Sequence, residues 1–330
     1  MKTEASPPDL QSAFDGWATW RALQRRPLND ESVALYESYW LSWGRHLAGI
    51  ELRWNDAEPR HVAAFLAGGL RPVTQARYRR VLDEVYAHAL RMEWIAQNPA
   101  APQPGLPQHE QPQSAALHID ERDRFVAGLP AGSEPGPLRD RALLLLLVLE
   151  GLSVAETIAL TLADVLPSPQ QPERLSVRGE RRNQTRELEL DARTVAALQA
   201  WLRAAAGAME LARPHEQPLL TDLRSRRWTM PLGRHAAFRI VRAAIRDAVD
   251  AGHLRTMPAE HGPSLLRNTA LLAWIEQGVA PTEVQRRAGL LRLDGLDRIV
   301  LRHAWGPVLE RFQQQRQAER AAGLPEGPAG

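Results

Sequence analysis

Residues 140–165 read DRALLLLLVLEGLSVAETIALTLADV and form the most strongly patterned stretch of the chain. Their first half is apolar almost all round, which periodicity alone allows as a buried helix or a buried strand, but the length favours a helix from about residue 138 to 150. Gly151 supplies a helix stop, and Ser153 with Glu156 forms the Ser-x-x-Glu capping-box pattern that begins a second helix. The stretch therefore predicts a tight corner between two packed helices in a protein core.

The composition bounds the class of protein. A length of 330 residues suggests two domains, each with its own core. The absence of cysteine excludes disulfides, thiolate nucleophiles and cysteine-based zinc sites. The N-terminus has no apolar leader and no run reaches the length of a membrane span, so we expect a cytoplasmic protein without a membrane partner.

The positive charge of the chain comes almost entirely from arginine. The formal net charge is +2 with a pI of about 9.4, and Lys2 is the only lysine. A GC-rich genome would produce this bias through codon choice, whereas a need for bidentate phosphate contacts would produce it through function. The bias is compatible with both origins.

The first third of the chain predicts a helical bundle followed by a linker. Apolar residues recur at helical spacing, with almost no strand pattern, in segments 9–23, 29–47, 61–70 and 74–94. Residues 101–116 then read APQPGLPQHEQPQSAA, which is rich in proline and glutamine and has no apolar period. Such a segment is typical of an extended connection between domains.

The second domain predicts helices around a small hairpin. We expect helices at 120–129 and 192–205, and the alternating stretches 174–178 (RLSVR) and 186–190 (RELEL) indicate two strands joined by a polar turn. Residues 223–246 contain no acidic residue and many arginines. Three of these share one face of a predicted amphipathic helix, opposite an apolar face of Phe238, Val241, Ile245 and Val249: Arg239, Arg242 and Arg246. A clustered row of cations is typical of a phosphate-binding surface, although a solvated arginine face is the alternative.

Several motifs resemble the tyrosine recombinases, also called phage integrases. The corner matches the family's Gly-Leu-Arg helix junction at Gly151, Leu152, Glu156, Leu160 and Asp164. The stretch GPSLLRNTALLAWIEQGVAPTEVQRRAG, residues 262–289, resembles the His-x-x-Arg segment at Pro263, Leu266, Arg267, Thr269, Gly278, Val284, Gln285 and Gly289. The N-terminal helices, which close on Trp94 and Asn98-Pro99, resemble the family's core-binding domain. The resemblance extends from about residue 14 to 305.

The resemblance implies a mainly α fold in two domains. A helical core-binding (SAM-like) domain at 1–99 would be joined by the linker 100–117 to a catalytic-type domain at 118–317, in which helices surround a small antiparallel sheet, and we expect residues 318–330 to be a disordered tail. The two domains would clamp duplex DNA. In the family, the C-terminal helix packs on a neighbouring protomer, which implies self-association through residues 307–317.

The family's catalytic set does not carry over. Members use a tyrosine nucleophile, two arginines that hold the phosphate, and lysine and histidine for proton transfer. By position, the first arginine corresponds to Ser153, the lysine to Glu180 (or Arg181 with a shift of one), the first histidine to Ser264, the second arginine to Arg267, the second histidine to Leu290 and the tyrosine to Ile299 (or Leu301). Only Arg267 keeps the family's residue. The tyrosines of the chain all lie in the first domain, at helical core positions: Tyr36, Tyr39, Tyr78 and Tyr86.

We therefore expect a DNA-binding member of this family that does not cleave DNA, acts as an accessory factor in recombination or integration, and requires no cofactor or metal. Its partners would be duplex DNA, and also itself or an active tyrosine recombinase. The candidate DNA contacts are Arg77, Arg80, Arg181, Arg182, Arg234, Arg239, Arg242, Arg246 and Arg267. Two alternatives remain open: an active recombinase with a non-standard active site, and a helical protein-protein adapter that has lost DNA binding.

Overall fold

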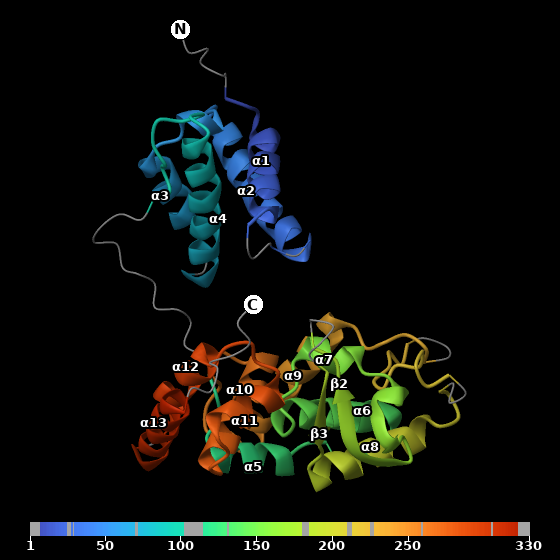
Figure 1. Cartoon of the computed structure of the whole chain (residues 1–330). Coiled ribbons are helices and arrows are strands. Elements are labelled where there is room, and N and C mark those ends of the chain that lie inside the picture. The colour runs from blue at the N-terminus through green and yellow to red at the C-terminus, as the bar shows by residue number, and fades with distance from the viewer. Residues whose placement is uncertain are drawn as a thin grey trace. The chain divides into compact units, whose positions relative to one another are not determined.

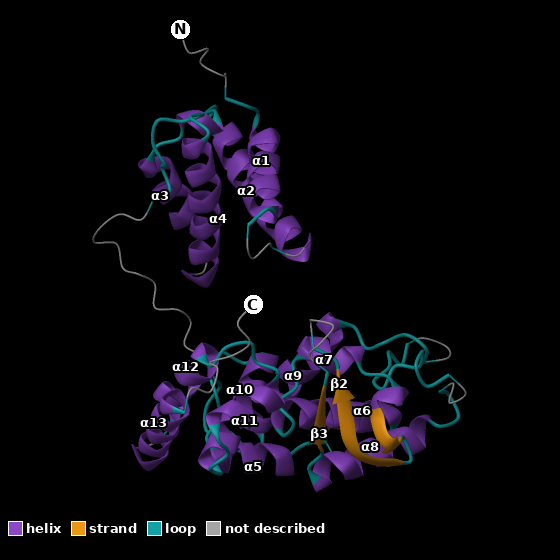
Figure 2. Cartoon of the chain, in the orientation of Figure 1, coloured by secondary structure: helices purple, strands orange, loops and turns teal. Residues whose placement is uncertain are grey.

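The computed structural model describes residues 7–24, 28, 30–69, 72–101, 115–130, 132–179, 185–209, 213–224, 228–258, 260–304 and 306–322. Contacts divide the chain into two units, residues 1–112 and 113–330. Helices make up most of both units, and the described strands all lie in the second (Figures 1 and 2). Each unit packs around its own hydrophobic core.

The first unit is a helical bundle with an aromatic core. Its elements are α1 (Leu10–Ala22), α2 (Asp30–Gly49), a short 3-10 helix (Trp54–Asp56), α3 (Pro59–Ala67) and α4 (Pro72–Arg91). The indole Nε1 of Trp43 donates to the Tyr86 hydroxyl at 2.9 Å, and that hydroxyl donates to the backbone oxygen of Trp54 at 2.8 Å. Tyr86 is fully buried, and burial raises the pKa of its hydroxyl. Tyr86 is therefore a core residue, as its helical position predicts.

The second unit is built around α6 (Pro135–Val148). Residues Ala142 to Val148 are buried on every side of this helix, which explains why the sequence there has no polar face. The other helices of the unit are α5 (Ile119–Ala127), α7 (Val154–Ala159), α8 (Ala192–Ala205), α9 (Arg234–Asp250), α10 (Pro263–Glu276), α11 (Pro281–Ala288), α12 (Asp294–His303) and α13 (Gly306–Ala321). The predicted helical corner is thus confirmed, and α6 contacts both α8 and α10.

A three-stranded antiparallel sheet lies beside the α6 corner. Its order is β1 (Val165–Ser168), β2 (Gln171–Val177) and β3 (Arg186–Glu189), with Val177 opposite Arg186 in the β2–β3 register. The sequence predicts β2 and β3 but misses β1, because a four-residue strand that contains a proline has too short a period to recognise. The turn between β2 and β3, residues 180–184, lies outside the described residues.

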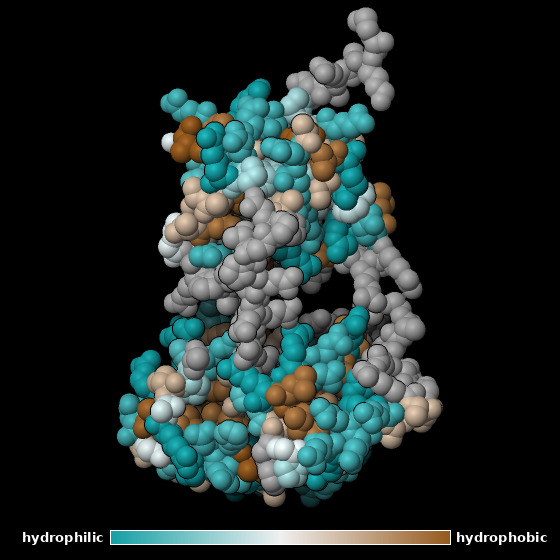
Figure 3. Space-filling view, turned by 90° about the vertical axis from the view of Figure 1, so that its left-hand side faces the viewer, coloured by the Kyte–Doolittle hydropathy of each residue, from teal (hydrophilic) through white to brown (hydrophobic). Residues whose placement is uncertain are grey.

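The last helix, α13, packs on its own unit. Val308 and Phe312 are each 3% exposed in a cluster formed with α10, α11 and α12. The expected disordered tail from residue 318 is wrong for its first turn, since α13 continues to Ala321. The reason is a tertiary anchor: Glu319 accepts hydrogen bonds from the Thr282 backbone N–H and hydroxyl at 3.1 and 2.8 Å. The surface on the α12–α13 side is mainly hydrophilic, broken by small hydrophobic patches (Figure 3).

Candidate functional site

The predicted capping box forms at the corner between α6 and α7. The Ser153 hydroxyl accepts from the Glu156 backbone N–H at 3.2 Å, and Glu156 Oε2 accepts from the Ser153 backbone N–H at 2.8 Å. Gly151 stands before it with φ +62°, and a Cβ built there would lie 2.9 Å from the Trp274 ring. Ser153 therefore has a local structural role at the position where the family carries an arginine.

A buried cluster of Arg186, Glu156 and Arg267 joins four elements behind this cap. Arg267 Nη1 lies 3.0 Å from Glu156 Oε2, and Arg186 Nη1 lies 2.8 Å from Glu156 Oε1. The side chains are 18%, 6% and 12% exposed for Arg267, Arg186 and Glu156. Both arginines also donate to the C-terminal end of α11, Arg267 to Ala288 O at 2.6 Å and Arg186 to Arg287 O at 2.7 Å. The cluster thus links α7, β3, α10 and α11.

The charges of this cluster are partly compensated internally. Burial raises the pKa of the Glu156 carboxyl, but the Arg186 and Arg267 guanidinium groups outweigh burial, and the net pKa is lowered. Glu156 is therefore ionised at neutral pH and neutralises part of the charge of both arginines. Arg267, which keeps the family's residue, faces this carboxylate and has a side chain that is mostly buried.

Arg186 was not among the residues singled out from the sequence. The signal was present, because Arg186 has the same strand phase as Leu188, and both are buried on β3 while Glu187 and Glu189 are exposed. An arginine on the inward face of a strand is rarely without a partner. The sequence alone could not show the partner of Arg186, because Glu156 lies on another element, α7.

The remaining family positions surround the cluster without completing a catalytic set. Ser264 is exposed in the first turn of α10, and Leu290 is half-buried beside the left-handed Gly289 that ends α11. Ile299 is 3% exposed and packs in the α10–α13 core, whereas Leu301 is 60% exposed. Glu180 lies outside the described residues.

Helix α9 presents three arginines, here called the arginine row, to solvent. Arg239, Arg242 and Arg246 are exposed, and none makes a hydrogen bond or ion pair within the described residues. The opposite face of α9 is buried through Ala237, Val241, Ala244, Ile245 and Ala248. Phe238, which the sequence pattern assigned to the apolar face, is instead 39% exposed. It lies at the edge of the buried face, near the N-terminal end of α9, and is only partly covered.

The other predicted DNA contacts differ in their surroundings. Arg77 is exposed on α4, and Arg80 of the same helix pairs with Glu84 at 3.0 Å. Arg234 is exposed at the start of α9. Arg181 and Arg182 lie outside the described residues. Of the predicted DNA contacts among the described residues, one unpaired arginine, Arg77, therefore lies in the first unit, whereas three lie on α9.

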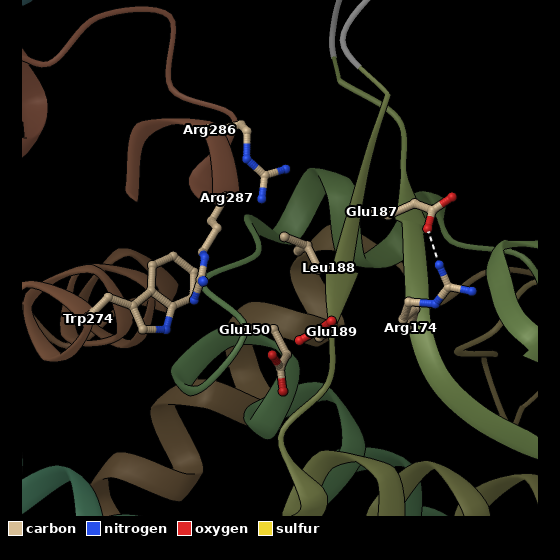
Figure 4. Close-up of a pocket in the computed structure, with 8 residues that line it drawn as sticks. All are labelled: Glu150, Arg174, Glu187, Leu188, Glu189, Trp274, Arg286 and Arg287. Atoms are coloured by element: carbon tan, nitrogen blue, oxygen red, sulfur yellow. Dashed lines mark hydrogen bonds and ion pairs between the residues drawn. The ribbon is translucent and has the colours of Figure 1, made fainter. Parts of the chain in front are cut away.

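A pocket of about 320 Å³ lies between β3 and α11, but its arginines are already paired (Figure 4). Arg174 bonds Glu187 at 2.6 Å, and Arg286 and Arg287 both bond Glu283. Glu150 also lines the pocket, and burial raises the pKa of its carboxyl to about 7. The pocket is therefore poorly suited to an anion.

Two further classes of site find no support within the described ranges. No group of three or more histidine, aspartate or glutamate side chains there is arranged to hold a metal ion. No helix in the same ranges combines the length and apolar character that a bilayer crossing demands.

Comparison with known proteins identifies similar chains. The tyrosine recombinase XerC of Pelobacter propionicus is 28% identical over 230 residues, which span 70% of this chain and 69% of that protein. The Tn1549 transposon integrase in complex with a circular intermediate DNA matches with a TM-score of 0.66 and 14% identity, over 92% of this chain and 99% of that one. XerH site-specific recombinase bound to palindromic difH substrate matches with a TM-score of 0.65 and 16% identity, over 89% and 79%. No family model matches the chain. The fold expected from the sequence is confirmed.

Proposed function

We propose that this chain, a relative of the tyrosine recombinases in fold and in sequence, binds duplex DNA through an arginine surface and does not cut it. It would act as an accessory or regulatory factor, on its own or with an active recombinase. The observation that carries the proposal is a contrast: the arginine row on α9 is exposed and unpaired within the described residues, while Arg267 is held by Glu156.

The charge pattern of α9 is unfavourable for the free helix, which supports a polyanionic partner. Arg234 occupies the positive end of the helix dipole, where a cation is unfavourable. Within the arginine row, Arg242 lies three positions after Arg239 and four before Arg246, and like charges at these spacings repel. A phosphate backbone would relieve this repulsion and release counterions.

The proposed absence of cleavage rests on the pairing within the buried cluster and on the residue at the nucleophile position. A scissile phosphate would compete with Glu156 for both arginines at 2.8 and 3.0 Å, and it would meet no tyrosine at the nucleophile position, where Ile299 is buried. Each preorganised donor lost from such a site typically costs about 3 to 4 kcal/mol in the barrier. Several losses together leave binding without chemistry.

The binding test is a salt series of duplex-DNA affinity by fluorescence anisotropy, on fragments that the protein enriches from a random pool. Changing the arginine row to glutamine should weaken binding and lower the slope of log affinity against log salt by about 3, since each phosphate contact contributes about 0.9. The matched control changes three exposed arginines that each bond an acidic neighbour: Arg213, Arg224 and Arg286. Both variants lose the same net charge, so an equal effect in both would defeat the assignment of the row.

Cleavage is tested on the same enriched fragment. Incubation with the wild-type protein, followed by denaturing electrophoresis, should show no covalent protein–DNA adduct. An adduct that disappears in a Tyr→Phe variant would overturn the proposal and favour a recombinase with a relocated nucleophile. No binding at any salt concentration would favour the protein adapter.

A further inference from the structure

Phe238 is an exposed aromatic side chain at the N-terminal edge of the arginine row of α9. It is 39% exposed, it directly precedes Arg239, and Arg242 lies one helical turn further along the same side. Single exposed apolar residues are common on protein surfaces. Phe238 differs from such residues in that two cations that are unpaired within the described residues, Arg239 and Arg242, lie beside it on the exposed face.

The Phe238 ring also lies against the N-terminal end of α10, the helix that carries Arg267. A Cβ built on Gly262, which caps the N-terminus of α10, would be 4.0 Å from Phe238 Cε1. Ser264, exposed two positions later, is in the first turn of the same helix. Phe238 therefore lies between the arginine row and the N-terminal end of α10. A DNA duplex bound by the row would also cover the Phe238 ring.

We propose that Phe238 reads DNA sequence by packing against the C5-methyl group of a thymine in the major groove. This inference rests on the proposed DNA binding and deepens it. A B-form major groove is wide enough for one α-helix, and thymine alone among the four bases presents a methyl group there. The arginines of the row would contact phosphates, which position the helix without reading bases. Phe238 would then supply sequence preference that the arginine row cannot supply.

The test is a double-mutant cycle between Phe238→Ala and the methyl group itself. Each thymine of the enriched site is replaced in turn by deoxyuridine, which lacks only the C5-methyl, and affinities are measured by anisotropy for both proteins. At one or two positions, the replacement should weaken wild-type binding about fourfold, the factor expected for one buried methyl group. The same replacement should not weaken binding by Phe238→Ala.

The control variant is Leu41→Ala, which removes an equally exposed apolar side chain from α2 in the other unit and should keep the wild-type response. Thermal unfolding of both variants checks that each is folded. If wild type binds no DNA, the proposed function itself fails. If wild type binds and the effect of deoxyuridine is the same in wild type and Phe238→Ala, or is absent in both, only the assignment of Phe238 is overturned.

Discussion

Replacing Glu156 with glutamine should destabilise the second unit by roughly 3 kcal/mol. The carboxylate forms ion pairs with two arginines at 2.8 and 3.0 Å, and all three side chains are at least 82% buried, the most exposed being Arg267 at 18%. Removing one partner of a buried ion pair typically costs about 3 to 5 kcal/mol, because the remaining charge is left without compensation. The amide oxygen of glutamine can still accept one hydrogen bond, so the lower end is expected. Urea unfolding followed by circular dichroism measures the change.

Glu283→Gln is the matched control, because Glu283 also accepts from two arginines, Arg286 and Arg287, at 2.7 and 2.8 Å. These side chains are 34%, 56% and 40% exposed, so the loss should be only about 0 to 1 kcal/mol. A loss in Glu156→Gln no larger than in Glu283→Gln would refute the buried-cluster reasoning.

The same variant has a defined pH dependence. The pKa of Glu156 in the folded protein is lowered from the ordinary value of 4.5, so its contribution to stability is present above that value and is lost as pH falls through the folded pKa. The difference in unfolding free energy between wild type and Glu156→Gln should therefore shrink in acid. In addition, inorganic phosphate should raise the melting temperature of Glu156→Gln more than that of wild type, because an anion could then compensate Arg186 and Arg267.

Three further predictions concern other features of the second unit. Changing Arg239, Arg242 and Arg246 together to glutamine should raise the unfolding free energy by about 0.5 kcal/mol at low salt, because two like-charge pairs disappear. Thermal melts measure this change, and a loss of stability would contradict the charge argument. Burial raises the pKa of Glu150 to about 7, so the contribution of the protonated carboxyl to stability is present below its unfolded pKa and is lost as pH rises towards 7. Glu150→Gln should therefore be more stable than wild type by roughly 2 to 3 kcal/mol at pH 8 and equally stable near pH 4. A variant whose stability depends on pH in the same way as that of wild type would contradict this argument. Gly151→Ala should lower the unfolding free energy more than Gly252→Ala in urea melts, since both glycines have positive φ but only a Cβ at Gly151 meets the Trp274 ring. Equal losses of stability would mean that backbone strain alone explains both effects.

Local sequence signals determined the elements and the corner. The run from Ala142 to Val148 has no polar face because α6 is buried on all sides, and Ser153 with Glu156 forms a capping box because both bonds close within four residues. The alternation in β3 and the arginine spacing in α9 were likewise readable, since the period of a side-chain pattern is set by the backbone geometry of the element itself. The resemblance to tyrosine recombinases rested on the same short motifs.

The tertiary structure decided which charges meet. The sequence assigned Arg267 to DNA contact, and only the packing of α7 and α10 on α6 brings it to Glu156, 111 positions away. The exposure of Phe238 was decided in the same way, because helical periodicity placed it on the apolar face, whereas its position at the edge of the packing leaves it 39% exposed. The physical reason is common to both cases: a periodic pattern specifies the direction of a side chain, whereas its partner and burial depend on which distant element packs there.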